Sequence, residues 1–231
     1  SKGLTMNSLR LLGMCVVILS VIGCESGVIT FPTPDPASVL IVNTTQNVPT
    51  VRVTMDSTIN VDVTRGDASA YTQVAAGRPV TFFIGSPTTV YRDNLRYTLG
   101  GNGRVILFVR GDTTSLVEFR REIQDTVLPA GATSSVIRFT HMAEKLESVS
   151  YLEVWITGGP RLLPEEYDIG ISSPVYHGIE PGTYSFEVRE GGTTNVLAVL
   201  PNVQISAGRS YMLYTYDADP PTVDSISLSI F

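Results

Sequence analysis

The feature that most limits the fold of this chain is a period of two in its apolar residues. In "VPTVRVTMD" (48–56) and "RPVTFFIG" (78–85), apolar residues alternate with polar ones, which is typical of strands with one face on a core. The segment "RVILFVRG" (104–111) is apolar at five consecutive positions and predicts a central strand covered on both faces. "SLVEFRREIQD" (115–125) fits either a strand or a short helix. Glycine, proline, asparagine and aspartate separate these runs, so we expect an all-β sandwich fold.

The two halves of the chain resemble each other. The matching pairs are "SVLIVNT" (38–44) with "SVIRFTH" (135–141), residues 65–84 with 169–188, and residues 103–112 with 208–217. A repeat of this length predicts two tandem modules. We assign residues 37–125 to a first β-sandwich repeat, 126–133 to a linker and 134–231 to a second β-sandwich repeat.

The amino-terminal segment has the pattern of an export signal. Arg10 precedes "LLGMCVVILSVIG" (11–23), an uncharged run too short to span a bilayer, so residues 1–23 are predicted to be a signal peptide with 1–5 as an upstream extension. Val21 to Cys24 resemble the bacterial lipobox, which implies cleavage before Cys24 and attachment of diacylglycerol and palmitate there. Residues 24–36, rich in proline, then form a tether between the lipid anchor and the folded part. The resemblance implies a lipoprotein of the bacterial cell envelope, and Glu25 favours the outer membrane, with the protein facing the periplasm or the surface.

The cysteine content bears on disulfide formation, and the net charge bears on the class of partner. Cys15 lies in the predicted signal peptide, so the mature chain would keep Cys24 alone and form no disulfide. Loss of Lys2 and Arg10 leaves 14 basic and 22 acidic residues, a net charge of −8. This acidic balance argues against nucleic acid as a partner.

Several turn and strand sequences resemble one family. "VNTTQNVPTVRVTMD" (42–56), "GDASAYTQVAAG" (66–77) and "GIEPGTYSFEVREGGTTNVLAVLPNVQISAGRSYMLY" (178–214) are similar to bacterial exported modules known as domain of unknown function 4397. The resemblance implies immunoglobulin-like β-sandwiches, often in tandem, and no particular reaction. The second half has "GISSP" (170–174) where the first has "GDAS", so any ligand held by Asp67 would be absent there.

No pattern of catalytic residues stands out. The chain has two histidines, His141 and His177, and none of the nucleophile, zinc, phosphate or dinucleotide motifs. We therefore expect no enzymatic activity, no cofactor and no metal site, and read the acidic "PEEYD" (164–168) as a solvated surface. Two RGD triplets, at 65–67 and 110–112, raise integrin binding as a further hypothesis, although turns are rich in these residues.

Two sets of residues are candidates for binding. An aromatic platform for stacking on sugar rings would use Trp155, Tyr176, Tyr184, Tyr214 and Tyr216, although Tyr214 and Tyr216 share a strand face opposite to Tyr211, so part of this set should be core. A terminal strand, "SISLSIF" (225–231), is a candidate interaction edge that would add to a partner's sheet. The apolar members of that edge are Ile226, Leu228 and Ile230.

From these observations we predict a non-catalytic, lipid-anchored envelope protein that acts as a protein-interaction or structural module. The alternative is a carbohydrate-binding module on the cell surface. Its partners would be the membrane, through Cys24, and either an envelope protein or a surface polysaccharide.

Overall fold

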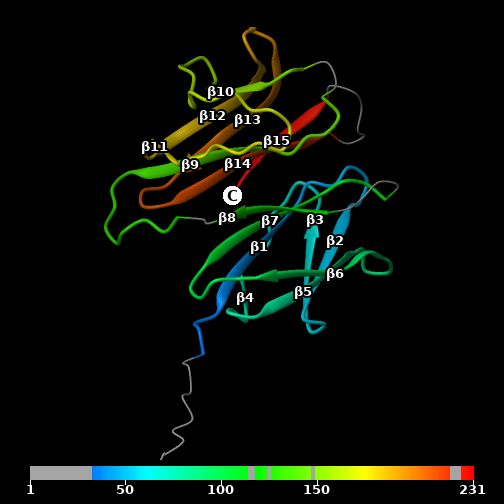
Figure 1. Cartoon of the computed structure of the whole chain (residues 1–231). Coiled ribbons are helices and arrows are strands. Elements are labelled where there is room, and N and C mark those ends of the chain that lie inside the picture. Colours follow the sequence, from blue (N-terminus) through cyan, green and yellow to red (C-terminus); the bar gives the residue numbers. More distant parts are fainter. Residues whose placement is uncertain (1–32, 114–117, 124–125, 147–148, 219–224) are drawn as a thin grey trace, which may run out of the picture. The chain divides into compact units, whose positions relative to one another are not determined.

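A computed structural model describes residues 33–113, 118–123, 126–146, 149–218 and 225–231 of the chain (Figure 1). The part from Pro34 to Phe231 is one compact unit. Its regular elements are all strands within the described residues, which confirms the predicted all-β class. The predicted signal peptide and the first nine residues of the predicted tether lie outside the described residues.

The first half of this unit contains two four-stranded sheets. One has the strand order β4-β1-β7-β8, in which β1 and β7 are parallel neighbours and the outer pairs are antiparallel. The other has the order β3-β2-β5-β6 and is antiparallel throughout. The strands are β1 (Ala37–Asn43), β2 (Thr50–Met55), β3 (Ile59–Thr64), β4 (Thr72–Val74), β5 (Pro79–Gly85), β6 (Val90–Thr98), β7 (Arg104–Arg110) and β8 (Glu118–Ile123).

The second half has the same arrangement with one strand fewer. A sheet with the order β11-β9-β14-β15 again joins two parallel central strands, β9 and β14, and the other sheet has the order β10-β12-β13. Backbone bridges from Tyr167 and Arg161 to β10 take the place that β3 has in the first half. The strands are β9 (Ser135–His141), β10 (Leu152–Ile156), β11 (His177–Ile179), β12 (Gly182–Glu190), β13 (Val196–Ile205), β14 (Ser210–Asp217) and β15 (Ile226–Ile230).

Strand β7 is buried on both faces, as its run of apolar residues predicts. Val105, Leu107 and Val109 belong to the core between the two sheets of the first half. Ile106 and Phe108 point to the opposite face and belong to a different cluster, which also contains Met212 and Tyr214 of β14. Because successive side chains of a strand alternate between faces, only an uninterrupted apolar run can serve two cores at once.

The structural repeat is shifted by one residue from the match made in the sequence for the central strands. The Ile41 carbonyl accepts a hydrogen bond from the Ser69 amide, and the Phe139 carbonyl accepts one from the Ser173 amide, so Ile41 corresponds to Phe139. Val39 therefore corresponds to Ile137 and not to Val136, and both lie in the core of their half. The sequence match followed identical letters, Ser-Val with Ser-Val, and was wrong in register. A shift of one residue moves every side chain of a strand to the other face, so the faces decide the correspondence. His141 accordingly corresponds to Asn43, not to Thr44.

The segment "SLVEFRREIQD" (115–125), for which the sequence allowed a strand or a short helix, contains strand β8 at Glu118–Ile123. Phe119 of this strand is 8% exposed and packs in the first core, in edge-to-face contact with Phe82. The proposed boundaries of the repeats at 37–125 and 134–231 remain a prediction, because the contacts unite both halves in one compact unit.

Candidate functional site

The clearest candidate site is the seam where the two halves meet. We call the β4-β1-β7-β8 sheet and the β11-β9-β14-β15 sheet the central sheets. Apolar side chains from both fill the seam, and the buried members of this cluster are Leu40, Val42, Ile106, Phe108, Met142, Met212 and Tyr214. Phe108 and Tyr214 hold corresponding positions on β7 and β14, and their rings meet edge to face with centroids 5.7 Å apart. A contact between corresponding residues is what a local two-fold axis relating β7 to β14 produces.

Polar contacts close the seam at one side. Tyr214 donates a hydrogen bond of 2.7 Å from its hydroxyl to the carbonyl of Gly66. The Arg65 guanidinium donates to the carbonyls of Asp217, at 2.6 Å, and Ala218, at 2.9 Å. Arg110 forms an ion pair with Glu144, with its Nη1 3.5 Å from Oε1. Both RGD arginines are therefore held at the contact between the halves, which gives these triplets a structural role that the sequence alone did not suggest.

Two buried titratable groups lie at the ends of the central strands of the second half, His141 at the end of β9 and Asp217 at the end of β14. His141 is 2% exposed, its Nδ1 lies 3.0 Å from the Thr215 hydroxyl, and burial lowers its pKa to about 4. Asp217 is fully buried, and burial raises its pKa, although the backbone amides of Lys145 and Glu144 donate to its Oδ1 and act in the opposite direction. Both groups therefore favour their neutral forms more than they would in water.

A second candidate site lies on the outer face of the β10-β12-β13 sheet, around Trp155. The Trp155 indole donates to Glu153, which also accepts a hydrogen bond of 3.0 Å from Arg161. Arg189 pairs with Glu187 and places its guanidinium over the Trp155 ring, 4.2 Å from the centroid. Each carboxylate has an arginine partner, although the two are only 6% and 4% exposed. The cluster is thus neutral overall, and one face of the indole is covered.

The other members of the predicted aromatic platform do not join Trp155. Tyr214 is 1% exposed in the seam, which leaves it no ring face for a sugar, and Tyr216 packs beside it. Tyr184 packs on the second core and stacks on Phe186, with ring centroids 5.9 Å apart. Tyr176 lies under the Arg138 guanidinium. Tyr214 and Tyr216 therefore lie together at the seam, and Trp155, Tyr176 and Tyr184 each lie elsewhere, so the five rings form no common platform.

The predicted interaction edge is an edge strand whose apolar side chains are occupied. Strand β15 ends its sheet and pairs only with β14 among the described strands. Ile226 and Leu228 are each 7% exposed and belong to the second core, and Ile230 packs against that core. The apolar residues of this strand therefore contribute to the second core.

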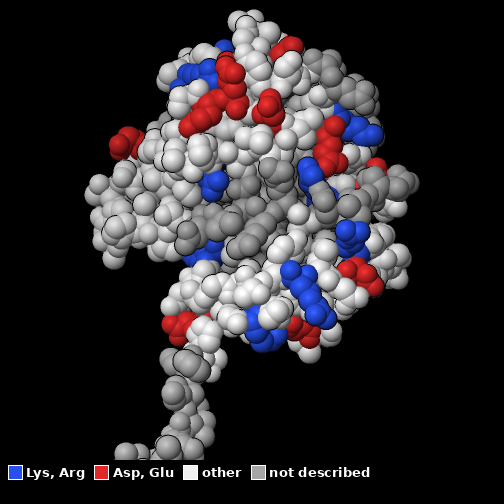
Figure 2. Space-filling model, viewed as in Figure 1, with Lys and Arg blue, Asp and Glu red and all other residues white. Residues whose placement is uncertain are grey.

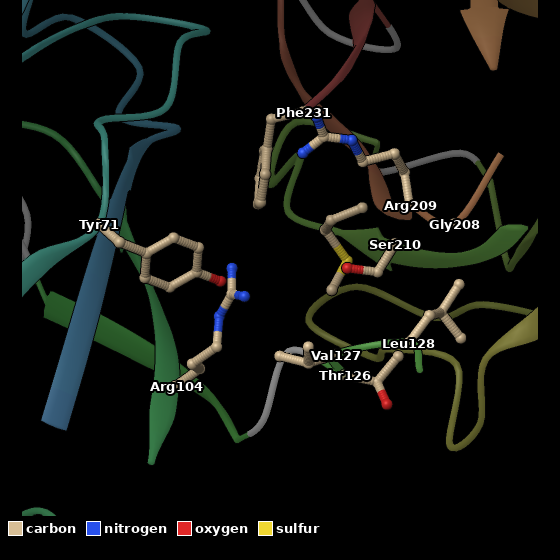
Figure 3. Close-up of a pocket in the computed structure, with 10 residues that line it drawn as sticks. Tyr71, Arg104, Thr126, Val127, Leu128, Gly208, Arg209, Ser210 and Phe231 are labelled. Carbon is tan, nitrogen blue, oxygen red and sulfur yellow. The ribbon is translucent and has the colours of Figure 1, made fainter. Parts of the chain in front are cut away.

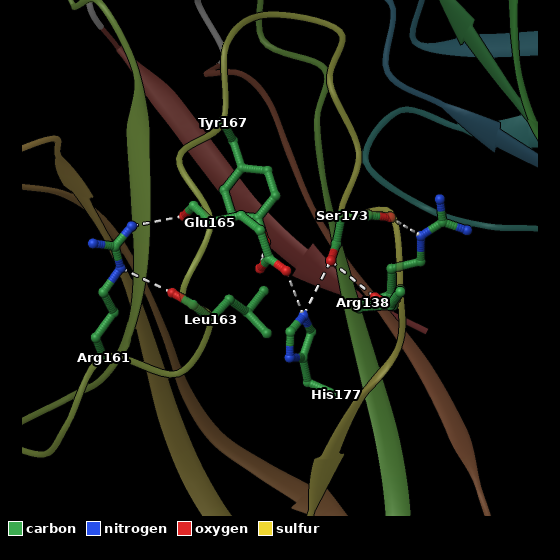
Figure 4. Close-up of polar contacts among 8 residues, drawn as sticks. Arg138, Arg161, Leu163, Glu165, Tyr167, Ser173 and His177 are labelled. Atoms are coloured by element: carbon green, nitrogen blue, oxygen red, sulfur yellow. Dashed lines mark hydrogen bonds and ion pairs between the residues drawn. The ribbon is translucent and has the colours of Figure 1, made fainter.

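A polar cluster that the sequence did not reveal lies beside β9 and β11 (Figure 4). Glu165 accepts a hydrogen bond of 2.7 Å from the Tyr167 hydroxyl, and its other oxygen lies 3.0 Å from Nε2 of His177. The same Nε2 lies 3.3 Å from the Ser173 hydroxyl. Burial alone would raise the pKa of Glu165, but the hydrogen bonds from Tyr167 and from its own backbone amide, together with His177, lower it. Only the folded chain brings these residues together, and "PEEYD" (164–168) therefore supplies a buried network besides solvated charge.

Serine, histidine and glutamate in one cluster invite comparison with a catalytic triad. In a triad the carboxylate orients one ring nitrogen and the serine contacts the other. Here both contacts fall on Nε2 of His177, and Ser173 is fully buried and donates its hydroxyl proton to the carbonyl of Val175 at 2.8 Å. This arrangement cannot pass a proton from serine to glutamate through the imidazole. It connects the 161–177 segment to the sheet instead, helped by Arg138, which donates to the Ser173 carbonyl.

Among the described residues, no group of three or more histidine, cysteine, aspartate or glutamate side chains is arranged to hold a metal ion. In the same part of the chain, no helix is both long and apolar enough to cross a bilayer. Cys24, the predicted lipidation site, lies outside the described residues.

Comparisons with known proteins give little further information. No family model and no curated protein matches the chain. Among solved structures, the chain is similar to a leucine-rich repeat protein from Bacteroides thetaiotaomicron, with 12% identity and a TM-score of 0.19 over 77% of this chain and 26% of that one. The chain thus spans about a quarter of that protein's length, and so low a TM-score supports no conclusion about fold or function.

Proposed function

We propose that this chain is a non-catalytic lipoprotein of the bacterial envelope, in which two β-sandwich repeats form one rigid structural or protein-interaction module. The seam is the observation that carries the proposal. Both central sheets bury their outer faces there, and both RGD arginines bind the opposite half. The buried seam fixes the orientation of one sandwich relative to the other. A fixed orientation of this kind suits a spacer or a scaffold.

The absence of catalysis is part of the proposal and is supported by the polar clusters. Each carboxylate around Trp155 is paired with an arginine, and Glu165 is occupied by Tyr167 and His177. A catalytic acid or base needs a proton that substrate can reach. The Glu165 cluster instead places its serine inside the protein. Membership of the family of domain of unknown function 4397 agrees with this proposal and remains part of it.

The anchor is tested by changing Cys24, the residue in the lipobox-like sequence. We expect a Cys24→Ser variant to lose labelled palmitate and to move from the membrane fraction to the soluble fraction after cell breakage, because two acyl chains supply the stable attachment. A matched Cys15→Ser variant changes the cysteine of the predicted signal peptide. It should still carry the palmitate label and stay in the membrane fraction. Equal labelling and sedimentation of the Cys24→Ser variant and its parent would refute the anchor.

Carbohydrate binding is the second candidate function, and Trp155 is the observation that favours it. Its indole is partly exposed on an outer sheet face beside arginine and carboxylate groups, which are groups that also bind sugar hydroxyls. If the site binds glycans, Trp155→Ala should abolish retention of the protein on purified envelope polysaccharide. Tyr211→Phe, which keeps its ring packed on the core, serves as the control. Unchanged retention of the Trp155→Ala variant, or no retention of the parent, would leave only the first function.

A further inference from the structure

A small pocket opens beside the seam and is lined by both halves of the chain (Figure 3). Tyr71 and Arg104 come from the first half, Arg209, Met212 and Phe231 from the second, and Val127 from the predicted linker. Its volume is about 210 Å³. This is below the range of roughly 300–1,000 Å³ common for drug-sized ligands, so a ligand of one or two rings is the size to consider.

The pocket brings positive charge together in an acidic protein. The guanidinium of Arg104 lies over the Tyr71 ring, 4.0 Å from its centroid, and this contact fixes its position at the pocket wall. Arg209 is exposed and extends into the same space from the opposite side (Figure 3). Among the described residues that line the pocket none is acidic, whereas the whole chain has a net charge of −6. Two arginines from opposite walls, with Arg209 exposed to an incoming ligand, favour an anion over a cation.

Apolar groups form the rest of the wall. Met212 is 2% exposed and belongs to the seam cluster, against which Tyr71 and Phe231 pack. Val127 is 68% exposed and adds an aliphatic side chain at the rim. Apolar walls with a few placed polar groups are the usual composition of a small-molecule site, in which the charge sets the orientation and the walls bury the body of the ligand.

We propose that this pocket binds a small organic carboxylate with an aromatic body. Arg209 pairs with the carboxylate, in the planar geometry that guanidinium and carboxylate share, and Arg104 adds positive charge opposite it. The ring of the ligand lies against Tyr71, Met212 and Phe231. Since both halves line the pocket, the bound ligand would also link them. This proposal is independent of the lipid anchor and of catalysis.

The test uses the full chain and 2-naphthoate, a fluorescent aromatic carboxylate, with binding followed by fluorescence anisotropy. We expect saturable binding that weakens at least fivefold in an Arg209→Gln variant, because the variant loses the ion pair with the carboxylate. The Arg209 side chain is exposed, so this change should not disturb the core. Arg78→Gln is the matched control, since Arg78 is another exposed arginine that pairs with Asp56 elsewhere and should leave the affinity unchanged. The uncharged amide of the same ring should bind at least fivefold more weakly than the acid.

Three results would overturn the proposal. The first is the lack of saturable naphthoate binding up to millimolar concentration. The second is equal affinity in the parent and the Arg209→Gln variant, which would move any binding to another surface. The third is equal affinity for the acid and its amide, which would show that the ring alone is recognised. Unfolding curves of both variants check that the fold is kept.

Discussion

At the scale of single residues, the two halves use one buried position in different ways. Asn43 donates through its side-chain amide to the carbonyls of Val48 and Val63, whereas His141 at the corresponding position contacts the Thr215 hydroxyl. Both are almost fully buried. The amide does not titrate, but the imidazole does, so only the second half has a pH-sensitive group at this position.

The buried imidazole makes stability depend on pH. The unfolded chain takes up a proton at His141 near pH 6.5, and the folded chain does so only near pH 4. Between these values the unfolded state binds more protons, so stability falls as the pH falls through this window. Asp217 acts in the opposite direction, because its raised pKa lets the folded state take up a proton first.

We predict that His141→Asn, which installs the residue found in the first half, flattens this pH dependence. Between pH 7 and pH 5 the parent should lose about 2 kcal/mol more unfolding free energy than the variant, because the pKa of His141 is about 4 when folded and 6.5 when unfolded. Urea unfolding at the two pH values measures the difference, and Asp217 contributes equally to both proteins. Parallel losses in parent and variant would show that His141 is not buried in its neutral form.

At the scale of elements, β15 shows how one alternating strand can serve a core and an edge at the same time. Ile226 and Leu228 point into the second core, and the alternating residues Ser227 and Ser229 lie on the opposite face of the strand. The strand therefore keeps Ile226 and Leu228 in the core, while its free backbone edge pairs with no other described strand.

We predict that Leu228→Ala lowers the unfolding free energy by about 2–5 kcal/mol, the usual cost of truncating a buried leucine. Ser227→Ala on the same strand is the control and should change stability by no more than about 0.5 kcal/mol. Chemical denaturation followed by circular dichroism measures both. A Leu228→Ala variant as stable as the control would show that Leu228 does not contribute to the core and is free to contact a partner.

At the scale of the whole molecule, the seam should make the two halves unfold together. Gly66 has a φ of +80° and lies so close to Tyr216 of the other half that an added Cβ would overlap the tyrosine hydroxyl. Gly131 has a similar φ of +84°, but nothing lies within 4 Å of the place its Cβ would take. The two positions share backbone strain and differ in the contact across the seam.

We predict that Gly66→Ala destabilises the protein by at least about 1 kcal/mol more than Gly131→Ala, because only the first displaces a residue of the opposite half. Trp155 is the single tryptophan and lies in the second half, so its fluorescence reports that half alone. A shift of the Trp155 transition by Gly66→Ala would show coupling between the halves. An unshifted transition would mean that they unfold independently.

Much of the architecture could be read from local pattern. Alternation predicted the strands around Val53 and Phe82, and the uninterrupted apolar run of β7 predicted burial on both faces. These properties depend on a period of two and on the side-chain types of one short segment, which the sequence displays directly. The opposite faces of Tyr211 and Tyr214 followed from the same rule.

Only the tertiary structure decided the rest. The register of the repeat, the use of Arg65 and Arg110 at the seam, the burial of Tyr214 and the cluster of Glu165, Ser173 and His177 all depend on residues far apart in the chain. Sequence identity cannot fix a strand register, since a slip of one residue leaves the letters nearly matched but reverses the faces. Which face meets a second sheet is a property of packing between elements, and no single segment contains that information.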